Sequence, residues 1–454
     1  FFNRIIIDDV MMYDQKGDSM IYASRISAKV SLLPLLNQKI SIASAQLFGL
    51  KANLYQQTPQ SKHNFQFVLD SLASKDTTKH TPLDLHIGSL IIRHGAVKYD
   101  KRYIASKSGV FSPAHISISD LSTHIIANHI TDDAINLHIK KLAFRDKSGL
   151  QLNSLSFKLD ADKREASLKE FELQLPHSDI TLGDIHATYR FDNGKLVMPT
   201  LQYSGSIEQS KITLSDIACL LPIFRHFEDA VFFETQFTGT STSLRCQKIN
   251  FKTGSGSINL QAKGRISDWN SRPAWDVDIA NLNLTEESIS FISHNLGKKI
   301  NVPKEVTRLG GIHYVGHLSG HGDRLSSKGR LEMGVGNADI QLAKNGKNIQ
   351  AKIATQGIAL DRILANKAFG QVATAIEVKG NKDNLVAKGE ISRFDYNKYS
   401  FRNISLDGQY NHGIVKGLAS IDDPNIRVNI EGNYAIKGNK YAINTHIDHL
   451  QPSI

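Results

Sequence analysis

The segments LHIKKLAF at residues 137–144 and LQLNSLSF at residues 150–157 share one pattern of apolar positions. In each segment two alternating apolar pairs are separated by two skipped residues. Alternation at every second residue is typical of a strand with one buried face. Strict alternation would turn the second pair outward, and one extra residue, as in a β-bulge or a strand break, restores the face. The pattern therefore predicts bent strands that curl a sheet around its apolar side.

This octad, apolar-x-apolar-x-x-apolar-x-apolar, recurs along the chain. Clear copies occupy residues 5–12, 85–92, 137–144, 150–157, 277–284 and 399–406, and weaker copies occupy residues 40–47 and 180–187. The skipped positions are mostly polar or small, as in Asp8-Asp9 and Arg402-Asn403. Any amphipathic β protein contains some such octads by chance, but their spread over the whole chain favours an architectural device.

Beyond the octads, apolar and polar residues alternate between regularly spaced turns. Alternation is plain at residues 64–69, 169–175 and 427–430, and hairpin signals containing Asn and Gly occur at residues 192–195, 344–347 and 437–440. We therefore predict an all-β fold, an elongated antiparallel β-groove (a β-taco) of repeated curled hairpins with a few short helices. The spacing leaves no room for the crossover helices of a parallel α/β sheet.

Four segments interrupt the β pattern and predict short helices. They span residues 31–36, 212–227, 284–297 and 357–365. Ser215 is a plausible N-cap in the second segment, and Gly297 ends the third. Each is too short to form a core alone, so we expect these helices to cap or edge a sheet whose apolar face would otherwise be open.

Composition and length suit one long folded segment. Hydrophobic residues make up 41% of the 454 residues, and no Pro-, Gly- or Ser-rich stretch marks a linker. We predict a continuous repeating segment over residues 1–454, with sub-repeats at 1–75, 76–211, 212–297 and 298–454. The chain starts in the manner of a strand at residues 4–7, so we expect an excised fragment that lacks its N-terminal membrane anchor and its C-terminal domain.

The formal net charge of +10 raises the question of a nucleic-acid partner. The basic residues are dispersed at alternate positions, as on the solvated face of a sheet, and no basic run with interleaved aromatics occurs. We therefore expect no nucleic-acid binding. The two cysteines are too few for a disulfide framework, and the apolar surroundings of Cys219 predict a buried free thiol rather than a bridge to Cys246.

Motifs of catalysis and cofactor binding are missing from the sequence. It contains no nucleophile elbow, phosphate-binding loop or zinc-protease motif. Of the 18 histidines, the group His313, His317 and His321 is the best metal candidate, but like the groups His86/His94 and His124/His129/His138 it occupies the polar positions of strands. We expect no catalytic residue, no metal and no cofactor, and an enzyme is the weakest hypothesis.

Residues 5–23 and 30–42 resemble the N-terminal repeat of TamB-like proteins, especially those of Bacteroidetes. Residues 214–222 also resemble a short helix of that group. On these residues the chain is similar to the TamB/AsmA family of translocation and assembly modules, as an N-terminal or middle segment.

The resemblance implies a trough-shaped β-groove in a periplasmic protein. It implies an inner-membrane anchor N-terminal to this chain, and an Omp85-class outer-membrane partner that is bound through a missing C-terminal region. The roles it implies are phospholipid transport between membranes and support of outer-membrane biogenesis.

From the octads we predict that ten residues line a groove for phospholipid acyl chains. They are Ile87, Leu90, Ile139, Leu142, Phe144, Leu152, Leu155, Phe157, Ile279 and Leu282. Two alternatives to a lipid-conducting groove stay open. One is a chaperone-like scaffold that assembles outer-membrane proteins, and the other is a non-catalytic β-sandwich or solenoid that binds through its surface.

Overall fold

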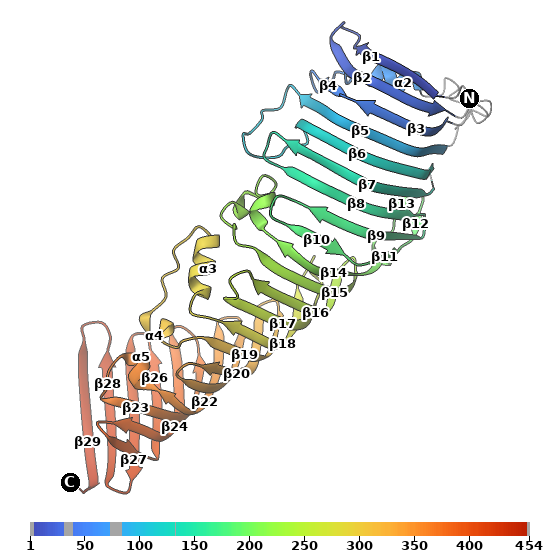
Figure 1. The fold of residues 1–454 in the computed structure, drawn as a ribbon. Helices are drawn as coiled ribbons and strands as arrows, with labels where there is room; N and C mark the ends of the chain where they lie inside the picture. The colour runs from blue at the N-terminus through green and yellow to red at the C-terminus, as the bar shows by residue number, and fades with distance from the viewer. Residues whose placement is uncertain (1–3, 31–39, 73–83, 132, 452–454) are drawn as a thin grey trace. The chain divides into compact units, whose positions relative to one another are not determined.

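The computed structural model describes residues 4–30, 40–72, 84–131 and 133–451 (Figure 1). The chain divides into two compact units, residues 1–241 with 294–297 and residues 242–293 with 298–454. Strands dominate both units, which confirms the all-β prediction. None of the helices in the described ranges combines the length and the hydropathy that a bilayer span requires.

In its described residues, the first unit contains fifteen strands and one α-helix. They are β1 (Arg4–Tyr13), β2 (Ser19–Val30), β3 (Ile40–Phe48), β4 (Lys51–Gln56), α2 (Gln66–Leu72), β5 (Asp84–Lys101), β6 (His115–Thr131), β7 (Ile135–Asp146), β8 (Gln151–Ala161), β9 (Glu165–Gln174), β10 (Asp179–Leu182), β11 (Ile185–Thr188), β12 (Phe191–Asp192), β13 (Lys195–Leu196), β14 (Gln202–Ile212) and β15 (Val231–Thr240). Short 3₁₀ turns lie at η1 (Met198–Thr200), η2 (Leu214–Ile217) and η3 (Pro222–Phe224).

The second unit is a meander of antiparallel strands with three short helices. Its elements are β16 (Ser243–Thr253), β17 (Ile258–Ser267), β18 (Ala274–Leu284), α3 (Ser288–Asn295), α4 (Lys304–Thr307), β19 (Ile312–His321), β20 (Arg324–Met333), β21 (Gly336–Asn345), β22 (Asn348–Ala359), α5 (Leu360–Leu364), β23 (Phe369–Gly380), β24 (Asn384–Tyr396), β25 (Tyr399–Phe401), β26 (Ile404–Asn411), β27 (Ile414–Asp423), β28 (Ile426–Ala435) and β29 (Lys440–Leu450). The last two residues of α3 fall in the first unit.

A register shift or a strand break occurs in seven of the eight octads, which confirms the predicted bulges and breaks there, whereas β1 runs through residues 5–12 without either. The pairing register shifts within the octads at residues 40–47, 85–92, 137–144, 150–157 and 277–284. The strand breaks in two within residues 180–187, between β10 and β11, and within residues 399–406, between β25 and β26. In the octad at residues 5–12, the skipped Asp9 adopts a φ of +53°, outside the β region.

The sheet of the first unit is mixed, whereas the sequence predicted antiparallel pairing throughout. Strands β3 and β4 both pair with β5 in parallel. A parallel pair requires a connection of a dozen or more residues, and β4 and β5 are separated by more than that number, with α2 between them. The octads at residues 40–47 and 85–92 lie side by side in this parallel pair.

The strand predicted at residues 64–69 is wrong. Residues 66–69 belong to α2, and Asn64 precedes the helix in a turn. The Asn64 side chain accepts a hydrogen bond from the amide of Tyr55 at 2.9 Å and donates one to the carbonyl of Asn53 at 3.0 Å. These bonds hold the segment against β4, so the local alternation does not determine its structure.

The helix predicted at residues 212–227 is also wrong as a single α-helix. The segment forms the two 3₁₀ turns η2 and η3, and Ser215 lies inside η2 rather than capping a helix. Pro222 begins η3, and proline lacks the amide hydrogen that a continuous helix would need there.

Other local predictions are confirmed. Helix α3 falls within residues 284–297 and α5 within residues 357–365. In the hairpin at residues 192–195, Asn193 and Gly194 have φ values of +48° and +72°, as a type I′ turn requires. The helix predicted at residues 31–36 lies outside the described residues. Both cysteines are free, Cys219 is buried, and burial raises the pKa of its thiol.

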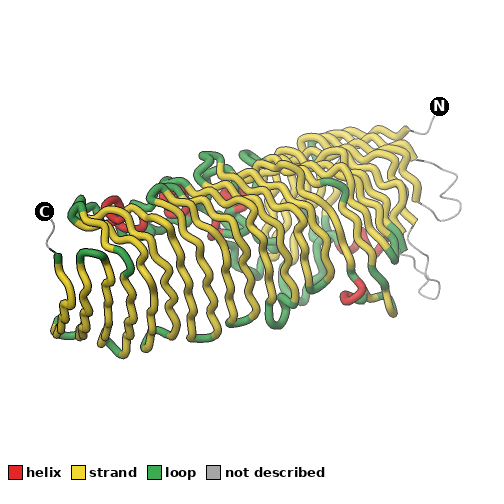
Figure 2. Tube along the Cα trace, turned by 90° about the horizontal axis from the view of Figure 1, so that it is seen from below, coloured by secondary structure: helices red, strands yellow, loops and turns green. Residues whose placement is uncertain are grey.

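No dry core between two packed sheets occurs in the described part of the chain. Its largest fully buried side chains are Met20, Asn295, Thr253, Ser178 and Ser210, of which only Met20 is apolar. A β-sandwich would instead bury large aliphatic and aromatic side chains between its sheets. Each unit is therefore built as a curved layer, and Figure 2 shows strands of the second unit bending over near one rim.

The exposure of side chains shows toward which face the second unit curls. Tyr314, Ala338 and Ile404 lie near the bulges, on the face of the strands that carries the apolar side chains. Their side chains are buried, with exposures of 5–7%. Further along the same face, Leu342 and Ile353 are 44% and 41% exposed. Residues on the inside of a bend are shielded, so the sheet curls toward its apolar face.

A buried aspartate stabilises the turn between β27 and β28. Asp423 is 5% exposed and accepts hydrogen bonds from the amides of Arg402 at 3.0 Å and Asn425 at 3.1 Å, and from the hydroxyl of Tyr399. Burial alone would raise the pKa of Asp423, but these hydrogen bonds outweigh it and hold the pKa below its ordinary value.

We predict that Asp423→Asn destabilises the second unit by about 1–3 kcal/mol at neutral pH, because a buried group loses its partners. The lowered pKa means that Asp423 contributes fully above its unfolded pKa near 3.8 and that this contribution is lost as the pH falls through the folded pKa. The free energy of unfolding of the variant should therefore fall less on acidification than that of the wild type, as measured by urea unfolding at several pH values. Asp422→Asn, at an exposed ion pair with Arg427, should cost less than about 1 kcal/mol. Equal costs for the two variants would contradict the prediction.

Candidate functional site

Cross-strand pairing lines up apolar residues on one face of the second unit. One row runs across eight strands through Ile279, Gly316, Gly329, Ile340, Ile353, Ile376, Gly389 and Leu406. The next row, two residues along each strand, runs through Val277, Leu318, Ser327, Leu342, Ala351, Val378 and Ala387. We call this surface the apolar face of the second unit.

The apolar face offers few free hydrogen-bonding groups. Its backbone amides and carbonyls pair within the sheet. The threonine hydroxyls on this face donate to the backbone, Thr355 to the carbonyl of Asn337 at 2.6 Å and Thr374 to the carbonyl of Glu390 at 2.9 Å. The surface is thus chemically suited to hydrocarbon rather than to a polar ligand.

Two aromatic side chains cover glycines at one end of the apolar face. A methyl group added at Gly329 would lie 2.5 Å from the Tyr314 ring, and one added at Gly320 would lie 2.4 Å from the Trp275 indole. Tyr314 therefore lies flat on the sheet, and its hydroxyl is 3.1 Å from that of Ser327. Aromatic rings over glycines fill the space that a missing side chain leaves.

The opposite face of the same strands is charged, and ion pairs connect neighbouring strands across it. Lys388 pairs with Asp407 at 2.8 Å, and Lys352 and Lys379 pair with Glu377 at 3.6 Å and 2.6 Å. Exposed pairs of this kind contribute little stability each, but they favour the register that keeps the two faces distinct.

A hollow of about 1070 Å³ in the second unit is lined by residues of both faces. Its lining includes Ile340, Ile353 and Ile376 of the apolar face, and Lys352 and Glu377 of the charged face. Because Ile353 is 41% exposed, the apolar face is open to solvent and is not an enclosed cavity.

The octads of β7 and β8 bring six of the predicted lining residues together in the first unit. Pairing places Ile139 opposite Phe157, Leu142 opposite Leu155, and Phe144 opposite Leu152. The rows continue through β6, because Ile125 pairs with both Ile139 and Leu90, and Ala127 pairs with Ile87. Leu152 is buried and the others are partly exposed. The rows thus form an apolar face in the first unit.

The remaining two predicted residues lie in β18. Ile279 is buried and Leu282 is partly exposed, on the two sides of the bulge in their octad. The prediction missed the most exposed part of the apolar face, around Leu342, Ile349 and Ile353. These strands carry no octad, but the strict alternation in residues 338–342 and 349–353 was available as a signal.

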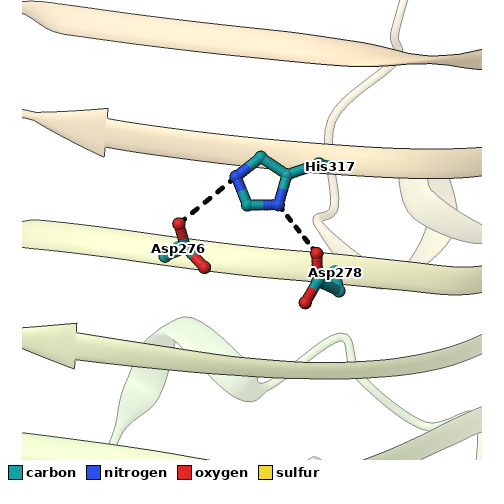
Figure 3. Close-up of side chains that lie close together, drawn as sticks. All are labelled: Asp276, Asp278 and His317. Carbon is teal, nitrogen blue, oxygen red and sulfur yellow. Dashed lines mark hydrogen bonds and ion pairs between the residues drawn. The ribbon is translucent and has the colours of Figure 1, made fainter.

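Among the described residues, one three-residue cluster has the ligand types of a metal site (Figure 3). The Nδ1 of His317 is 2.8 Å from Asp278, and its Nε2 is 3.2 Å from Asp276. Only a protonated imidazole can donate from both nitrogens, and Lys263 lies 3.6 Å from Asp278. The arrangement therefore works as an ion-pair network between β18 and β19. Sequence reasoning missed it because the two aspartates come from a neighbouring strand.

The three histidines of β19 do not converge. His313 lies 3.2 Å from Glu332 on β20, whereas His317 contacts the aspartates of β18. In the first unit, His124 contacts Ser89 at 3.2 Å and His86 contacts the carbonyl of Asn128 at 2.6 Å. These four histidines, His313, His317, His124 and His86, thus each have a separate local partner.

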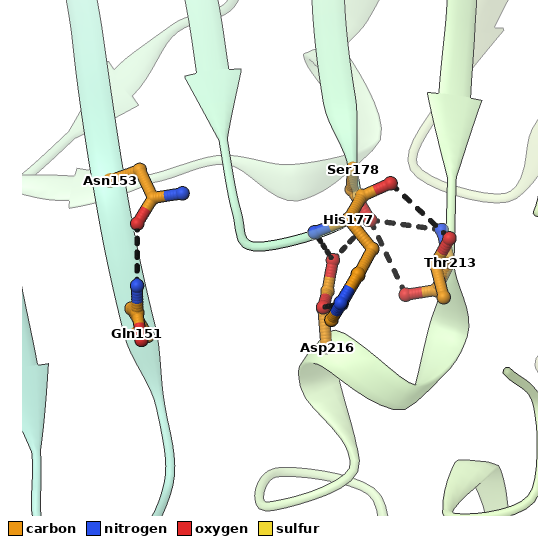
Figure 4. A network of polar contacts seen from close by, with 6 residues as sticks. All are labelled: Gln151, Asn153, His177, Ser178, Thr213 and Asp216. Carbon is orange, nitrogen blue, oxygen red and sulfur yellow. Dashed lines mark hydrogen bonds and ion pairs between the residues drawn. The ribbon is translucent and has the colours of Figure 1, made fainter.

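A network of hydrogen bonds joins the turn between β9 and β10 to η2 (Figure 4). Asp216 accepts hydrogen bonds from the Ser178 hydroxyl at 2.7 Å, from the His177 amide at 3.0 Å and from His177 Nδ1 at 2.8 Å. The Ser178 oxygen in turn accepts the Thr213 amide at 2.9 Å. A serine nucleophile would be activated by the imidazole, whereas this serine donates to the carboxylate, so the network is structural. Figure 4 also shows Gln151 donating to Asn153 on β8, at 2.8 Å.

No family model matches this chain, and neither a curated protein nor a solved structure matches it.

We predict that the His317 network makes the second unit less stable at alkaline pH. The hydrogen bond to Asp278 is the main cause that raises the pKa of His317, with Asp276 adding to it and burial opposing it. A raised pKa contributes stability that is complete below the unfolded value of 6.5 and is lost as the pH rises through the folded value.

Urea unfolding between about pH 6 and pH 9 should show this loss in the wild type and a smaller loss in His317→Gln. His321→Gln is the matched control, since His321 lies on the same strand and face and contacts no carboxylate in the described part of the chain. A His317→Gln profile as steep as the wild-type profile would contradict the prediction.

Proposed function

We propose that this chain is a segment of a periplasmic bridge of the TamB/AsmA type, whose apolar face carries phospholipid acyl chains between membranes in support of outer-membrane biogenesis. In this proposal the whole protein is anchored in the inner membrane and meets an Omp85-class outer-membrane protein through regions outside this chain. One observation carries the proposal: a curved single-layer sheet with an apolar inner face whose large side chains are exposed.

The exposed apolar side chains supply the binding energy that an acyl chain needs. Leu325, Leu342, Ile349 and Ile353 are each more than 40% exposed on neighbouring strands of this face. Transfer of a methylene from water to such a surface is worth about 0.8 kcal/mol, so a 16-carbon chain gains at most on the order of 10 kcal/mol. The charged headgroup would stay in water, as it does at a membrane surface.

The geometry also favours a mobile, linear ligand. The rows cross many strands without a deep pocket, and the hydroxyls on the face are already bonded to the backbone. A surface without fixed polar contacts holds hydrocarbon without fixing its position, which suits a conduit better than a specific receptor site.

The two alternative hypotheses fare differently. A surface-binding β-sandwich requires a closed apolar core, and the described residues bury few large apolar side chains. A scaffold for client strands of outer-membrane proteins stays a hypothesis. It would use the edge of the sheet rather than the apolar face, so substitutions on that face separate it from lipid binding.

We predict that phospholipid binds the purified chain, and that Ile353→Asp combined with Ile376→Asp lowers the bound amount at least tenfold. These residues are cross-strand neighbours on the apolar face, and a carboxylate there is incompatible with a hydrocarbon ligand. The measurement is native mass spectrometry of the chain after incubation with phospholipid, with the lipid identified after extraction.

The matched control is Ala354→Asp combined with Ala375→Asp. Ala354 and Ala375 are also cross-strand neighbours, one residue along on the charged face, so the added charge and the strand pair are the same. The control should retain lipid. Lipid-free wild type, or equal binding by the two folded double variants, would contradict the proposal.

A further inference from the structure

The helices α4 and α5 form a basic and apolar patch at one rim of the second unit. Strands β18, β20 and β22 end at this rim, and β19, β21 and β23 begin there. Figure 1 shows α4 and α5 beside one another, and a hydrogen bond of 3.0 Å from Arg308 to the carbonyl of Ile363 joins them. Arg362 also donates to the carbonyl of Gly334 at 2.5 Å, which fixes α5 to the turn between β20 and β21.

The patch exposes three large apolar side chains that nothing in the described structure covers. Ile300, Val306 and Leu364 are 39%, 42% and 44% exposed. They lie outside the sheet, so they take no part in its apolar face. Val306 lies on α4, Leu364 on α5 and Ile300 in the loop that precedes α4. These exposed aliphatic side chains contribute nothing to a core, so a partner surface that buries them is the simplest account.

Lysines surround these apolar residues. Lys298, Lys299, Lys304 and Lys367 are all exposed, and none forms an ion pair with another described residue. Glu305 is the one exposed acid between residues 298 and 308. The patch therefore combines an excess of positive charge with apolar side chains.

We propose that the α4–α5 patch attaches this rim to the surface of an anionic phospholipid bilayer. Lysines near such a surface are attracted by the negative headgroups, while the apolar side chains enter the boundary between headgroups and acyl chains. Charge complementarity selects this partner over a neutral membrane. The inference is independent of whether the apolar face carries lipid, because the patch and that face share no residue.

The test is co-sedimentation of the whole chain with vesicles. The chain should bind vesicles of phosphatidylcholine and phosphatidylglycerol in equal parts, bind pure phosphatidylcholine vesicles far more weakly, and lose binding as salt is raised. The triple variant Lys298→Glu, Lys299→Glu, Lys304→Glu should bind about 100-fold more weakly, from roughly fivefold per lysine. Ile300→Ser with Val306→Ser should weaken binding about tenfold without changing its salt dependence.

The matched control changes three exposed lysines at the opposite rim: Lys344→Glu, Lys347→Glu and Lys382→Glu. Lys344 lies near the end of β21, and Lys347 and Lys382 lie in the turns β21–β22 and β23–β24. The control carries the same net charge as the patch variant. It should keep most of the vesicle binding, and Ile353→Asp with Ile376→Asp should keep it fully, which separates this test from lipid binding on the apolar face.

Two results would overturn the proposal. Equal losses in the patch variant and the opposite-rim control would mean that total charge, not the patch, controls binding. Full binding by the patch variant would mean that the patch serves another contact, such as a protein partner.

Discussion

The structure depends on one constraint: every bend in a strand must return its apolar side chains to the same face. A single-layer sheet has no second layer to hide a side chain that turns outward, so a one-residue slip would expose an entire half-strand. The extra residue in each octad meets this constraint, because a bulge or break bends the strand and restores the face together. In the octad pair of β7 and β8, the bulges occur on both strands, and Leu142 still lies opposite Leu155. The bulges and breaks also make the sheet curl toward its apolar face, which buries Ile404 on the inside of the bend.

Stability in such a layer comes from pairing and turns more than from a core. Few large apolar side chains are fully buried in the described residues. The chain relies on backbone ladders, on ion pairs across the charged face such as Lys388 with Asp407, and on buried polar networks at strand ends around Asp216 and Asp423. Along much of its length, the apolar face is not packed against another layer. A ligand can therefore bind there without displacing side chains that stabilise the fold.

The sequence predicted the features that one strand and its turn determine alone. The octads located bulges, and the Asn193-Gly194 pair located a hairpin, because both depend on local backbone geometry. It failed where distant segments decide the outcome. Asn64 bonds to β4 and turns an alternating segment into the approach to a helix. The parallel pairing of β3 with β5 and the meeting of His317 with Asp276 and Asp278 depend on strand neighbours that no local pattern reveals.

Cysteine accessibility distinguishes an apolar face that is open to solvent in the second unit from one that another layer covers. The background protein has Cys246 replaced by serine and retains the buried Cys219. Single cysteines added at positions 342 and 353 report on the apolar face, one at position 354 on the charged face, and one at position 404 on the inside of the bend. We expect Leu342→Cys and Ile353→Cys to react with a water-soluble maleimide nearly as fast as Ala354→Cys, and Ile404→Cys to be protected until the protein unfolds. Protection at positions 342 and 353 equal to that at position 404, in a lipid-free protein, would show that another layer covers this face and would contradict the account.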